Sequence, residues 1–385
     1  MNFSLSNATP FYSLDSLDLL EFWIYTAVLP AVCVFGTVGN LLCFAVLTRK
    51  RMRTSLNTYL AGLSIIDLFL LLTALLIYPA LAVCAWYGSH YQWVCKFFWT
   101  TSTVTYPFSL MAQFSSVWSC VLITIDRFCA VKFPLANRLY SSPHQAIRRL
   151  AVVTVCAVLY RIPAFFELSH NENGQLIMTE LRRNQLYQTI YLVWMYFVVI
   201  VLVPWGLMIA LNLFVVVEIN RAAYRRNELA SRKCILATNR RKRSLERLVH
   251  DHRSTLLTVA VTSCFLICNL PIFLSHVLDS MPDQHRQPEV QRLFVMFGNL
   301  FICVNCLTNS LIYILLGRHF FDTYKQLLCK PCQKRSQTAE FGLIEAAQLS
   351  LGPARIELRR AGFRKNKLET VRLLSAPADR RQIYA

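Results

Sequence analysis

Charge is scarce in this chain. Asp, Glu, Lys and Arg make up 16% of its 385 residues, against about 25% in ordinary globular proteins. So few charges cannot cover the surfaces of the roughly two and a half soluble domains that this length suggests. Glycine is also rare, with 11 residues, and the 14 cysteines are spread along the whole chain. Collagen-like chains, intrinsically disordered chains and disulfide scaffolds are therefore excluded.

What the chain has instead is a series of long apolar stretches. They occupy approximately 22–47, 58–84, 98–125, 150–166, 187–217, 254–278 and 293–316. A helix needs about 20 apolar residues to cross the hydrocarbon core, and all of these stretches meet or approach that length. The alternation expected for the strands of a membrane barrel is absent. We therefore predict an all-α membrane protein, a bundle of seven transmembrane helices.

The basic residues decide the predicted orientation. Of the 40 Lys and Arg residues, 34 lie in four segments: 49–57, 127–149, 218–253 and 318–385. Because cytoplasmic segments carry an excess of Lys and Arg, these segments are predicted to lie inside the cell. The predicted organisation is an extracellular segment 1–21, a seven-helix domain 22–317 and a cytoplasmic tail 318–385, in a multi-pass plasma-membrane protein. Glycosylation sequons at Asn2 and Asn7 agree with an extracellular N-terminus.

The net charge of +19 does not indicate a nucleic-acid partner, because the charges avoid the apolar stretches. The basic run at 240–243 is predicted to contact membrane lipids instead. Apolar residues recur at helical spacing over about 318–330, which predicts an amphipathic helix lying on the membrane. Beside it, Cys329 and Cys332 are either palmitoylation sites or free thiols.

A few polar residues lie within the apolar stretches. Asp67 is a carboxylate in the middle of a span, where such a group is unfavourable and usually functional. Smaller polar residues lie in other spans: Asn40, Ser116, Asn305 and Asn309. For each of these taken alone, an ordinary hydrogen bond between helices is the commoner explanation.

Short motifs follow one another in order along the spans. They are Gly39-Asn40, Leu63 with Asp67, Asp126-Arg127-Phe128, Pro204, Cys268-Asn269-Leu270-Pro271 and Asn309-Ser310-Leu311-Ile312-Tyr313. Together they resemble the rhodopsin-like G-protein-coupled receptors over about residues 22–330. Three further segments, at 162–167, 179–184 and 194–196, resemble the invertebrate FMRFamide-type neuropeptide receptors within that family. The resemblance implies a receptor that activates a heterotrimeric G protein, with arrestin as a further partner.

Several positions depart from the family pattern. Asn269 stands in place of the usual Trp of the sixth span, Ser310 in place of the usual Pro of the seventh, and Asn212 in place of the usual Tyr of the fifth. The loop at 167–186 has no cysteine for the usual disulfide to the third span. Near the outer surface lie Cys84 and Cys95, for which a local disulfide and two free thiols both remain open.

The resemblance also implies roles for individual residues. Arg127 would pair with acidic neighbours at rest and meet the G protein on activation, with Asp126 and Asp251 as its partners. For Asp251, an ordinary solvated charge is the alternative. Asn309 and Tyr313 belong to the same activation set. An allosteric Na⁺ pocket is implied at Asp67, Ser116, Asn305 and Asn309, with a protonated or water-filled network as the alternative. No other cofactor is predicted.

The predicted ligand is a short basic peptide with an amidated Arg-Phe end. The resemblance points to this class, and the outer segments are biased towards acidic residues, which steers basic ligands. Glu167 is predicted to pair with the ligand guanidinium while the adjacent rings hold its Phe. The alternative is that Glu167 pairs internally with Arg161 or Arg182. The predicted ligand-binding residues are Glu167, Phe165, Phe166, Ser109, Gln113, Glu180 and Asp279.

Other functions are disfavoured by the sequence. There is no metal-spaced His/Cys cluster, phosphate-binding glycine loop or nucleophile elbow, so an enzyme is not predicted. A monoamine receptor is disfavoured because Ser109 stands where amine receptors carry Asp. A transporter or channel is disfavoured because coupled transporters usually need more ionisable groups within the membrane. A receptor for a small odorant or metabolite remains the alternative within the predicted fold.

Overall fold

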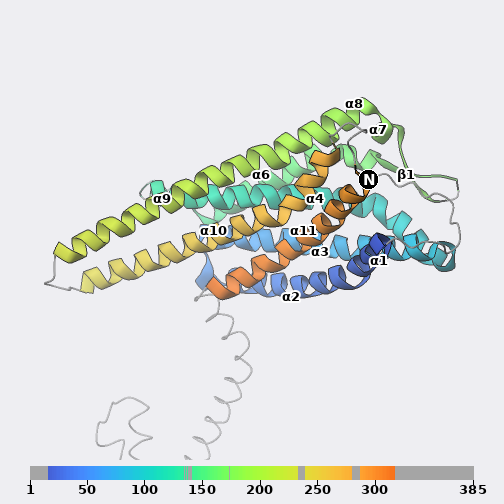
Figure 1. Ribbon diagram of the computed structural model, residues 1–385. Coiled ribbons are helices and arrows are strands. Elements are labelled where there is room, and N and C mark those ends of the chain that lie inside the picture. The colour runs from blue at the N-terminus through green and yellow to red at the C-terminus, as the bar shows by residue number, and fades with distance from the viewer. Residues whose placement is uncertain are drawn as a thin grey trace, which may run out of the picture. The chain divides into compact units, whose positions relative to one another are not determined.

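The computed structural model describes residues 16–316 except 134, 136, 138–140, 173, 233–238 and 280–286; it does not describe the side chains of 51, 89, 222–254, 279 and 316. Within this part of the chain, seven helices are long and apolar enough to cross a membrane (Figure 1). The predicted all-α bundle is confirmed. Its spans are Ser16–Leu47, Ser55–Tyr87, Gln92–Lys132, Pro143–Phe166, Gln185–Arg221, Thr255–Leu278 and Pro288–Leu315.

The first four spans combine regular helices with short segments of other helix types. The first consists of α1 (Ser16–Trp23), the π-helical η1 (Ile24–Val28) and α2 (Leu29–Leu47), and the short η2 (Lys50–Met52) follows it. The second is α3 (Ser55–Tyr87), and η3 (Gly88–Tyr91) leads from it into the third, α4 (Gln92–Lys132). The fourth is α6 (Pro143–Arg161) with η4 (Ile162–Phe166).

A short connection leads from the fourth span to the fifth. It contains strands β1 (Leu168–His170) and β2 (Leu176–Met178) and the single turns α7 (Glu180–Arg183) and α8 (Gln185–Tyr187). The fifth span is formed by η5 (Gln188–Met195), η6 (Phe197–Leu202) and α9 (Val203–Arg232), and its first half is π-helical. The last two spans belong to α10 (Asn239–Asp279) and α11 (Pro288–Leu316).

The helix ends explain why the spans are longer than the apolar stretches. The fourth span begins at Pro143, before the predicted boundary at residue 150, because Ser142 caps the helix by accepting a hydrogen bond from the backbone N–H of Gln145 at 3.3 Å. Thr54 caps α3 in the same way, accepting from Asn57 at 3.2 Å. Polar first turns are compatible with a helix, so hydropathy marks only the apolar middle of each span.

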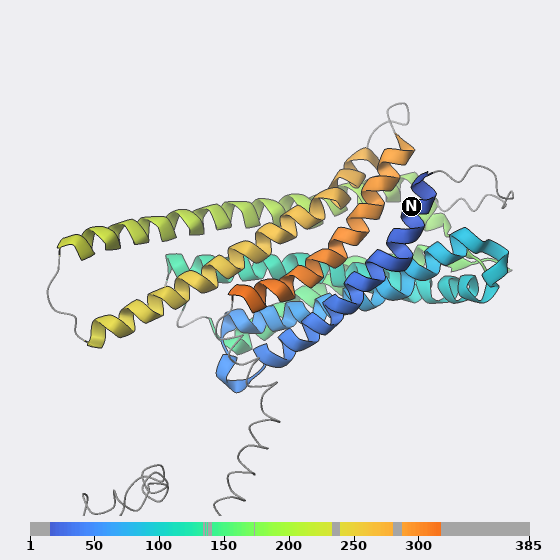
Figure 2. The ribbon, with the colours of Figure 1, turned by 60° about the horizontal axis from the view of Figure 1, so that its bottom comes forward.

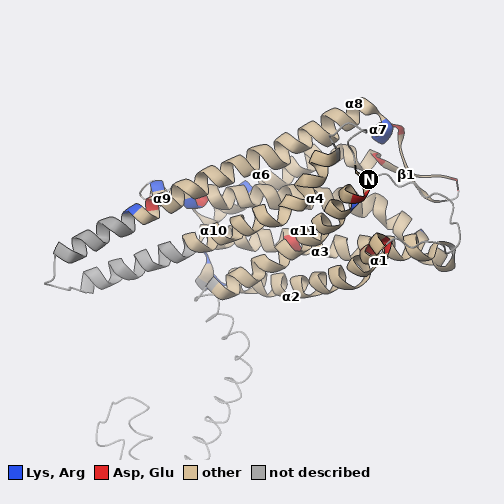
Figure 3. Ribbon diagram, viewed as in Figure 1, with Lys and Arg blue, Asp and Glu red and all other residues tan. Residues whose placement is uncertain are grey.

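The second and third spans occupy the centre of the bundle. α3 and α4 pack against each other, α2 contacts α3 and α11, α10 packs on α11, and α9 and α6 pack on α4. Outward-facing side chains are often large and apolar, as at Phe35, Leu213 and Leu315. Charged residues are nearly absent from the middle of the bundle (Figure 3). An apolar belt of this kind suits contact with lipid tails.

One end of the bundle carries a small antiparallel hairpin, in which Leu168 of β1 pairs with Met178 of β2. At the same end, a disulfide joins Cys84 at the end of α3 to Cys95 at the start of α4. The views in Figures 1 and 2 agree that this end also carries the beginning of α1. We call it the hairpin end. From sequence alone, 167–186 is predicted only as a loop, since strands of three residues leave almost no periodic pattern.

Some predicted features lie outside the described residues. They are the sequons at Asn2 and Asn7, the amphipathic helix at 318–330, and Cys329 and Cys332. The backbone at Asp251 and Asp279 belongs to α10, but the side chains at these two positions are not described. The roles suggested for these residues stay predictions.

Close approach of α10 and α11 depends on a glycine. A Cβ added at Gly298 would lie 3.0 Å from both the backbone N and the Cα of Ile272. Gly298→Ala is expected to push the two helices apart and lower the free energy of unfolding by about 1–3 kcal/mol. Thermal unfolding of the purified protein in detergent measures the effect.

Gly206 in α9 provides a matched control, because no described atom lies within 4 Å of its added Cβ. Gly206→Ala is expected to leave the melting temperature unchanged or raise it, since alanine favours a helix by up to about 1 kcal/mol. Equal melting temperatures for the Gly298→Ala variant and the unmodified protein would contradict the close packing.

Candidate functional site

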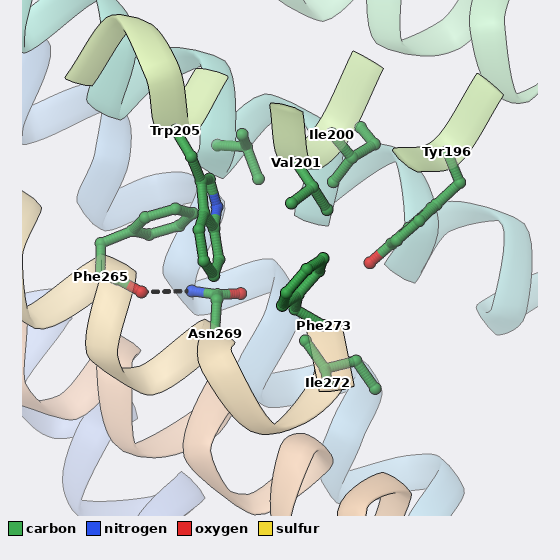
Figure 4. A pocket seen from close by; sticks show the side chains of 9 residues that line it. Tyr196, Ile200, Val201, Trp205, Phe265, Asn269, Ile272 and Phe273 are labelled. Carbon is green, nitrogen blue, oxygen red and sulfur yellow. Dashed lines mark hydrogen bonds between the residues drawn. The ribbon is translucent and has the colours of Figure 1, made fainter. Parts of the chain in front are cut away.

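An apolar pocket lies between α4, η6, α9 and α10. The cavity is small, and its lining is mainly aromatic and aliphatic. Figure 4 shows the Tyr196 hydroxyl and the rings of Trp205 and Phe273 directed towards this space. The lining residues are Val117, Tyr196, Ile200, Val201, Trp205, Phe265, Asn269, Ile272 and Phe273.

The polar groups of this pocket are few. The Asn269 side chain donates a hydrogen bond to the Phe265 carbonyl oxygen at 2.8 Å, within its own helix (Figure 4). The Tyr196 hydroxyl lies within hydrogen-bonding reach of the Gln113 side chain on α4. Gln113 therefore adjoins the pocket, although none of the predicted ligand-binding residues is part of its lining.

The predicted ligand-binding residue Glu167 is held inside the protein. Its side chain is buried and forms an ion pair with Arg182. It also accepts hydrogen bonds from the hydroxyls of Tyr187 at 2.8 Å and Tyr106 at 3.1 Å. Arg161 and Arg182 are the two internal partners predicted for Glu167, and the structure pairs Glu167 with Arg182. In this conformation the carboxylate already has three donors, so it is not free for a ligand guanidinium.

The electrostatics of this pair follow from its surroundings. Burial by itself would lower the pKa of Arg182, but the charges and hydrogen bonds of Tyr106 and Glu167 raise it above its ordinary value. The guanidinium therefore stays charged. A buried charge pair with several hydrogen bonds fixes the position of α7 and the hairpin relative to α4 and α8.

The two phenylalanines next to Glu167 point elsewhere. Phe165 packs edge-to-face on Phe108 of α4, with ring centroids 5.7 Å apart, and both rings are largely exposed on the outside of the bundle. Phe166 is 64% exposed. The structure thus does not bring these rings to the pocket, and their contact with a ligand ring stays a prediction. Sequence adjacency on a helical turn places them on different sides.

Other predicted ligand residues are spread around the hairpin end. Ser109 is half-buried on α4, four residues before Gln113. Glu180, the first residue of α7, is exposed. Exposure leaves Glu180 accessible to a ligand, with an interaction weakened by water and salt.

The opposite end of α4 carries a compact polar cluster. The buried carboxylate of Asp126 accepts hydrogen bonds from Ser55 and Ser141, each at 2.9 Å, and pairs with Arg127 at 2.6 Å. Arg127 is only 14% exposed. The cluster ties α3, α4 and the segment before α6 together. Its charge-assisted bonds hold the arginine in one defined position.

A second polar cluster lies between α3 and α11. The Asn309 side chain donates to Asp67 at 2.9 Å, and both residues are fully buried. Ser116 and Asn305 are buried as well. Among the described residues, the Oδ1 atoms of Asp67, Asn305 and Asn309 are buried without a hydrogen-bond partner. A cation or water molecules can provide the partners that these three buried oxygen atoms lack.

The positions that depart from the family pattern take part in polar contacts. The Asn212 side chain donates to the Thr262 hydroxyl at 2.7 Å and so links α9 to α10. The Ser310 hydroxyl donates to the Leu307 carbonyl at 2.7 Å, and Ser310 lies against Gly39, where an added Cβ would clash. In place of a proline kink, this part of α11 therefore has a hydroxyl packed tightly on α2.

Comparisons with known proteins agree with this arrangement. The family model described as 7 transmembrane receptor (rhodopsin family) matches residues 39–313. Similar proteins include the FMRFamide receptor of Drosophila melanogaster, 26% identical over 331 residues, and an FMRFamide peptide receptor of Caenorhabditis elegans, 28% identical over 316 residues. The sex peptide receptor of Drosophila melanogaster is 23% identical over 350 residues.

The alignment with the Drosophila FMRFamide receptor covers 83% of this chain and 56% of that receptor. For the Caenorhabditis elegans receptor the two shares are 78% and 68%. For the sex peptide receptor they are 84% and 77%. The chain thus spans little more than half the length of the Drosophila FMRFamide receptor.

Removing one partner of the Glu167–Arg182 pair is expected to destabilise the hairpin end. Arg182→Met leaves a buried carboxylate without its counter-charge and should lower the free energy of unfolding by about 3 kcal/mol. Adding Glu167→Gln should restore part of the loss, because the remaining group is then neutral. Thermal unfolding of the purified variants measures both effects.

Arg183→Met is the matched control, since Arg183 is the exposed neighbour in the same turn. It should shift the melting temperature little. If Arg182→Met and Arg183→Met behave alike, the buried pair does not stabilise the protein.

Proposed function

This chain belongs to the rhodopsin family of seven-transmembrane receptors, and on that premise we propose that it is a receptor for a short peptide that activates a heterotrimeric G protein. The hairpin end faces the outside of the cell in this proposal, and the Asp126–Arg127 cluster faces the cytoplasm. The excess of Lys and Arg in the segments beyond the Arg127 end supports this orientation.

The observation that carries the proposal is the distribution of polar sites along α4. This single helix contributes Val117 and Gln113 at or beside the aromatic pocket, the buried Ser116, and the Asp126–Arg127 pair at its other end. A ligand that changes the packing around the pocket can shift the helix ends because the bundle is tightly packed. Binding and G-protein contact are thus two distinct sites on one element.

The peptide class rests on the relatives and on charge. Two of the similar receptors carry FMRFamide in their names, and such a peptide has an Arg next to an amidated Phe. We propose an amidated Arg-Phe peptide as the ligand. With Glu167 paired to Arg182, the exposed Glu180 is the described acidic residue proposed to meet its basic group. Asp279, whose side chain is not described, is proposed as a further acidic partner. Glu167 itself would bind the ligand only by exchanging Arg182 for the ligand guanidinium.

An allosteric Na⁺ is part of the proposal. The buried Oδ1 atoms of Asp67, Asn305 and Asn309 fit a hard cation, which prefers oxygen ligands. Asp67, Asn305, Asn309 and Ser116 would hold the ion, and its charge would offset the buried carboxylate. The ion would stabilise the arrangement of α3, α4 and α11 seen here.

The function can be tested with the full-length receptor in lipid nanodiscs. Phe-Met-Arg-Phe-NH₂ and a panel of amidated peptides ending in Arg-Phe are expected to stimulate nucleotide exchange on purified G proteins, and none should cause solute flux in liposomes. Arg127→Ala should keep peptide binding but reduce stimulated exchange more than about tenfold, because a charge-assisted contact with the G protein is lost.

Arg148→Ala is the control, since it removes an exposed arginine from the same end of the bundle. Full activation of Arg127→Ala would contradict its assigned role. Activation by a small uncharged metabolite and by none of the peptides would contradict the ligand class.

Sodium is expected to weaken agonist binding. An ion that prefers the resting arrangement must lower agonist affinity by linkage, here by about tenfold between sodium-free and high-sodium buffer. Choline keeps the ionic strength constant. Asp67→Asn should abolish the sodium effect because it removes the charge that attracts the ion. If the affinity of the unmodified receptor does not depend on Na⁺, the sodium site is contradicted, and a protonated or water-filled network is the alternative.

A further inference from the structure

Arg161 is the last residue of α6, and it is buried deeply, with 3% of its surface exposed. Its guanidinium carbon lies 4.8 Å from the ring centroid of Tyr160 and 5.7 Å from that of Tyr196. The cation is therefore enclosed by aromatic rings. Among the described residues, its Nε and Nη2 atoms are buried and have no hydrogen-bond partner.

No carboxylate neutralises this arginine in the described part of the chain. Glu167, the nearest acidic residue in sequence, is committed to Arg182. The Tyr191 hydroxyl lies within reach of the guanidinium, but a neutral phenol does not offset a charge. Aromatic rings stabilise a cation only in part and accept none of its directed N–H bonds. Water can accept hydrogen bonds from an arginine buried in this way, but an acceptor from outside the chain that also offsets its charge must be an anion.

The two unpaired nitrogens indicate which acceptor fits. Nε and Nη2 lie on one edge of the guanidinium plane, where a carboxylate accepts two parallel hydrogen bonds. A carboxylate also supplies the missing negative charge. A neutral carbonyl would satisfy at most part of this requirement, and a basic group would be repelled.

A shared neighbour, Tyr196, connects Arg161 to the aromatic pocket. Tyr196, whose ring contacts the guanidinium, lines the aromatic pocket with its hydroxyl directed inwards (Figure 4). The arginine thus lies directly beside the pocket, on the side of α6. The pocket lining itself contains no charged residue.

We propose that Arg161 and Tyr196 form a subsite that binds a carboxylate of the receptor's ligand. This subsite rests on the proposed function, because it requires a ligand that enters the bundle from the hairpin end. In an amidated peptide the carboxylate is an Asp or Glu side chain; in a peptide with a free C-terminus it is the terminal group. The ligand then carries an acidic group in addition to any basic residue that reaches the outer acidic positions.

The first experiment needs no peptide and therefore tests the subsite apart from the proposed function. Full-length receptor in nanodiscs is titrated with 3-phenylpropionate or with 3-phenylpropanamide at constant ionic strength, and the thermal shift gives each affinity. The carboxylate is expected to bind about tenfold more tightly than the amide, as two charge-assisted bonds replace neutral ones. Arg161→Met should abolish this preference and leave amide binding unchanged.

The ligand-free Arg161→Met protein should melt at the same or a higher temperature, because the substitution removes an unpaired buried charge. Arg161→Lys should keep the charge but lose the bidentate contact, and so retain only part of the preference. Arg292→Met is the matched control, because Arg292 is half exposed and already paired with Asp18 and Glu21. It should leave the preference intact.

Two results overturn the subsite: equal affinity of the unmodified receptor for the carboxylate and the amide, or a preference that survives in Arg161→Met. If Arg161→Met does not fold, the comparison is made between the unmodified receptor and Arg161→Lys. Equal affinity of the unmodified receptor for the carboxylate and the amide, or a full preference for the carboxylate in Arg161→Lys, then overturns the subsite.

Peptides then identify the source of the carboxylate. Phe-Met-Arg-Phe-NH₂ is compared with Asp-Phe-Met-Arg-Phe-NH₂ and with the free acid Phe-Met-Arg-Phe. A gain for the Asp peptide that is lost in Arg161→Met assigns the subsite to an acidic side chain, and a gain for the free acid assigns it to the C-terminus. No gain for either carboxylate overturns a role in peptide recognition. Inactivity of all three peptides contradicts the proposed ligand class and leaves the phenylpropionate result to decide on the subsite.

Discussion

Lipid tails offer no hydrogen-bond partner, so every polar group in the membrane-spanning part of this chain must find one within the protein. The helices satisfy the backbone, and many hydroxyls bond back to their own helix, as Thr73 does to the carbonyls of Phe69 and Leu70. Asn40 donates to carbonyls of both its own helix and α11, at 2.9 Å each. Such contacts fix the relative positions of α2 and α11 where side-chain packing alone would allow sliding.

The same constraint makes the exceptions informative. Buried atoms without a partner occur at several places in the described part of the bundle, and two of these places, around Asp67 and around Arg161, contain a buried charged side chain. One place presents oxygen atoms and the other presents N–H donors, so they call for ligands of opposite charge. A buried charged group with an unmet hydrogen-bonding atom is a position where water, an ion or a ligand from outside the chain can bind.

The hairpin end combines rigid and open parts. The Glu167–Arg182 pair, the hydroxyls of Tyr106 and Tyr187, and the Cys84–Cys95 disulfide hold the hairpin and the helix ends in place. The aromatic pocket beside Tyr196 lies further into the bundle. A rigid rim lowers the conformational entropy that the protein itself loses when a ligand binds, because the rim is already ordered.

The sequence by itself determined the features that depend on local composition. It predicted the number of spans, the central position of Asp67 within the second span and the Asp126–Arg127 pair at the end of the third, because hydropathy and neighbouring residues are enough for these. The tertiary structure decided which distant residues meet. It chose Arg182 over Arg161 as the partner of Glu167, joined Cys84 to Cys95, turned Phe165 and Phe166 outwards and left Arg161 enclosed by rings. These outcomes depend on helix rotation and on the path of a short hairpin, and a shift of one residue along a helix turns a side chain to another face.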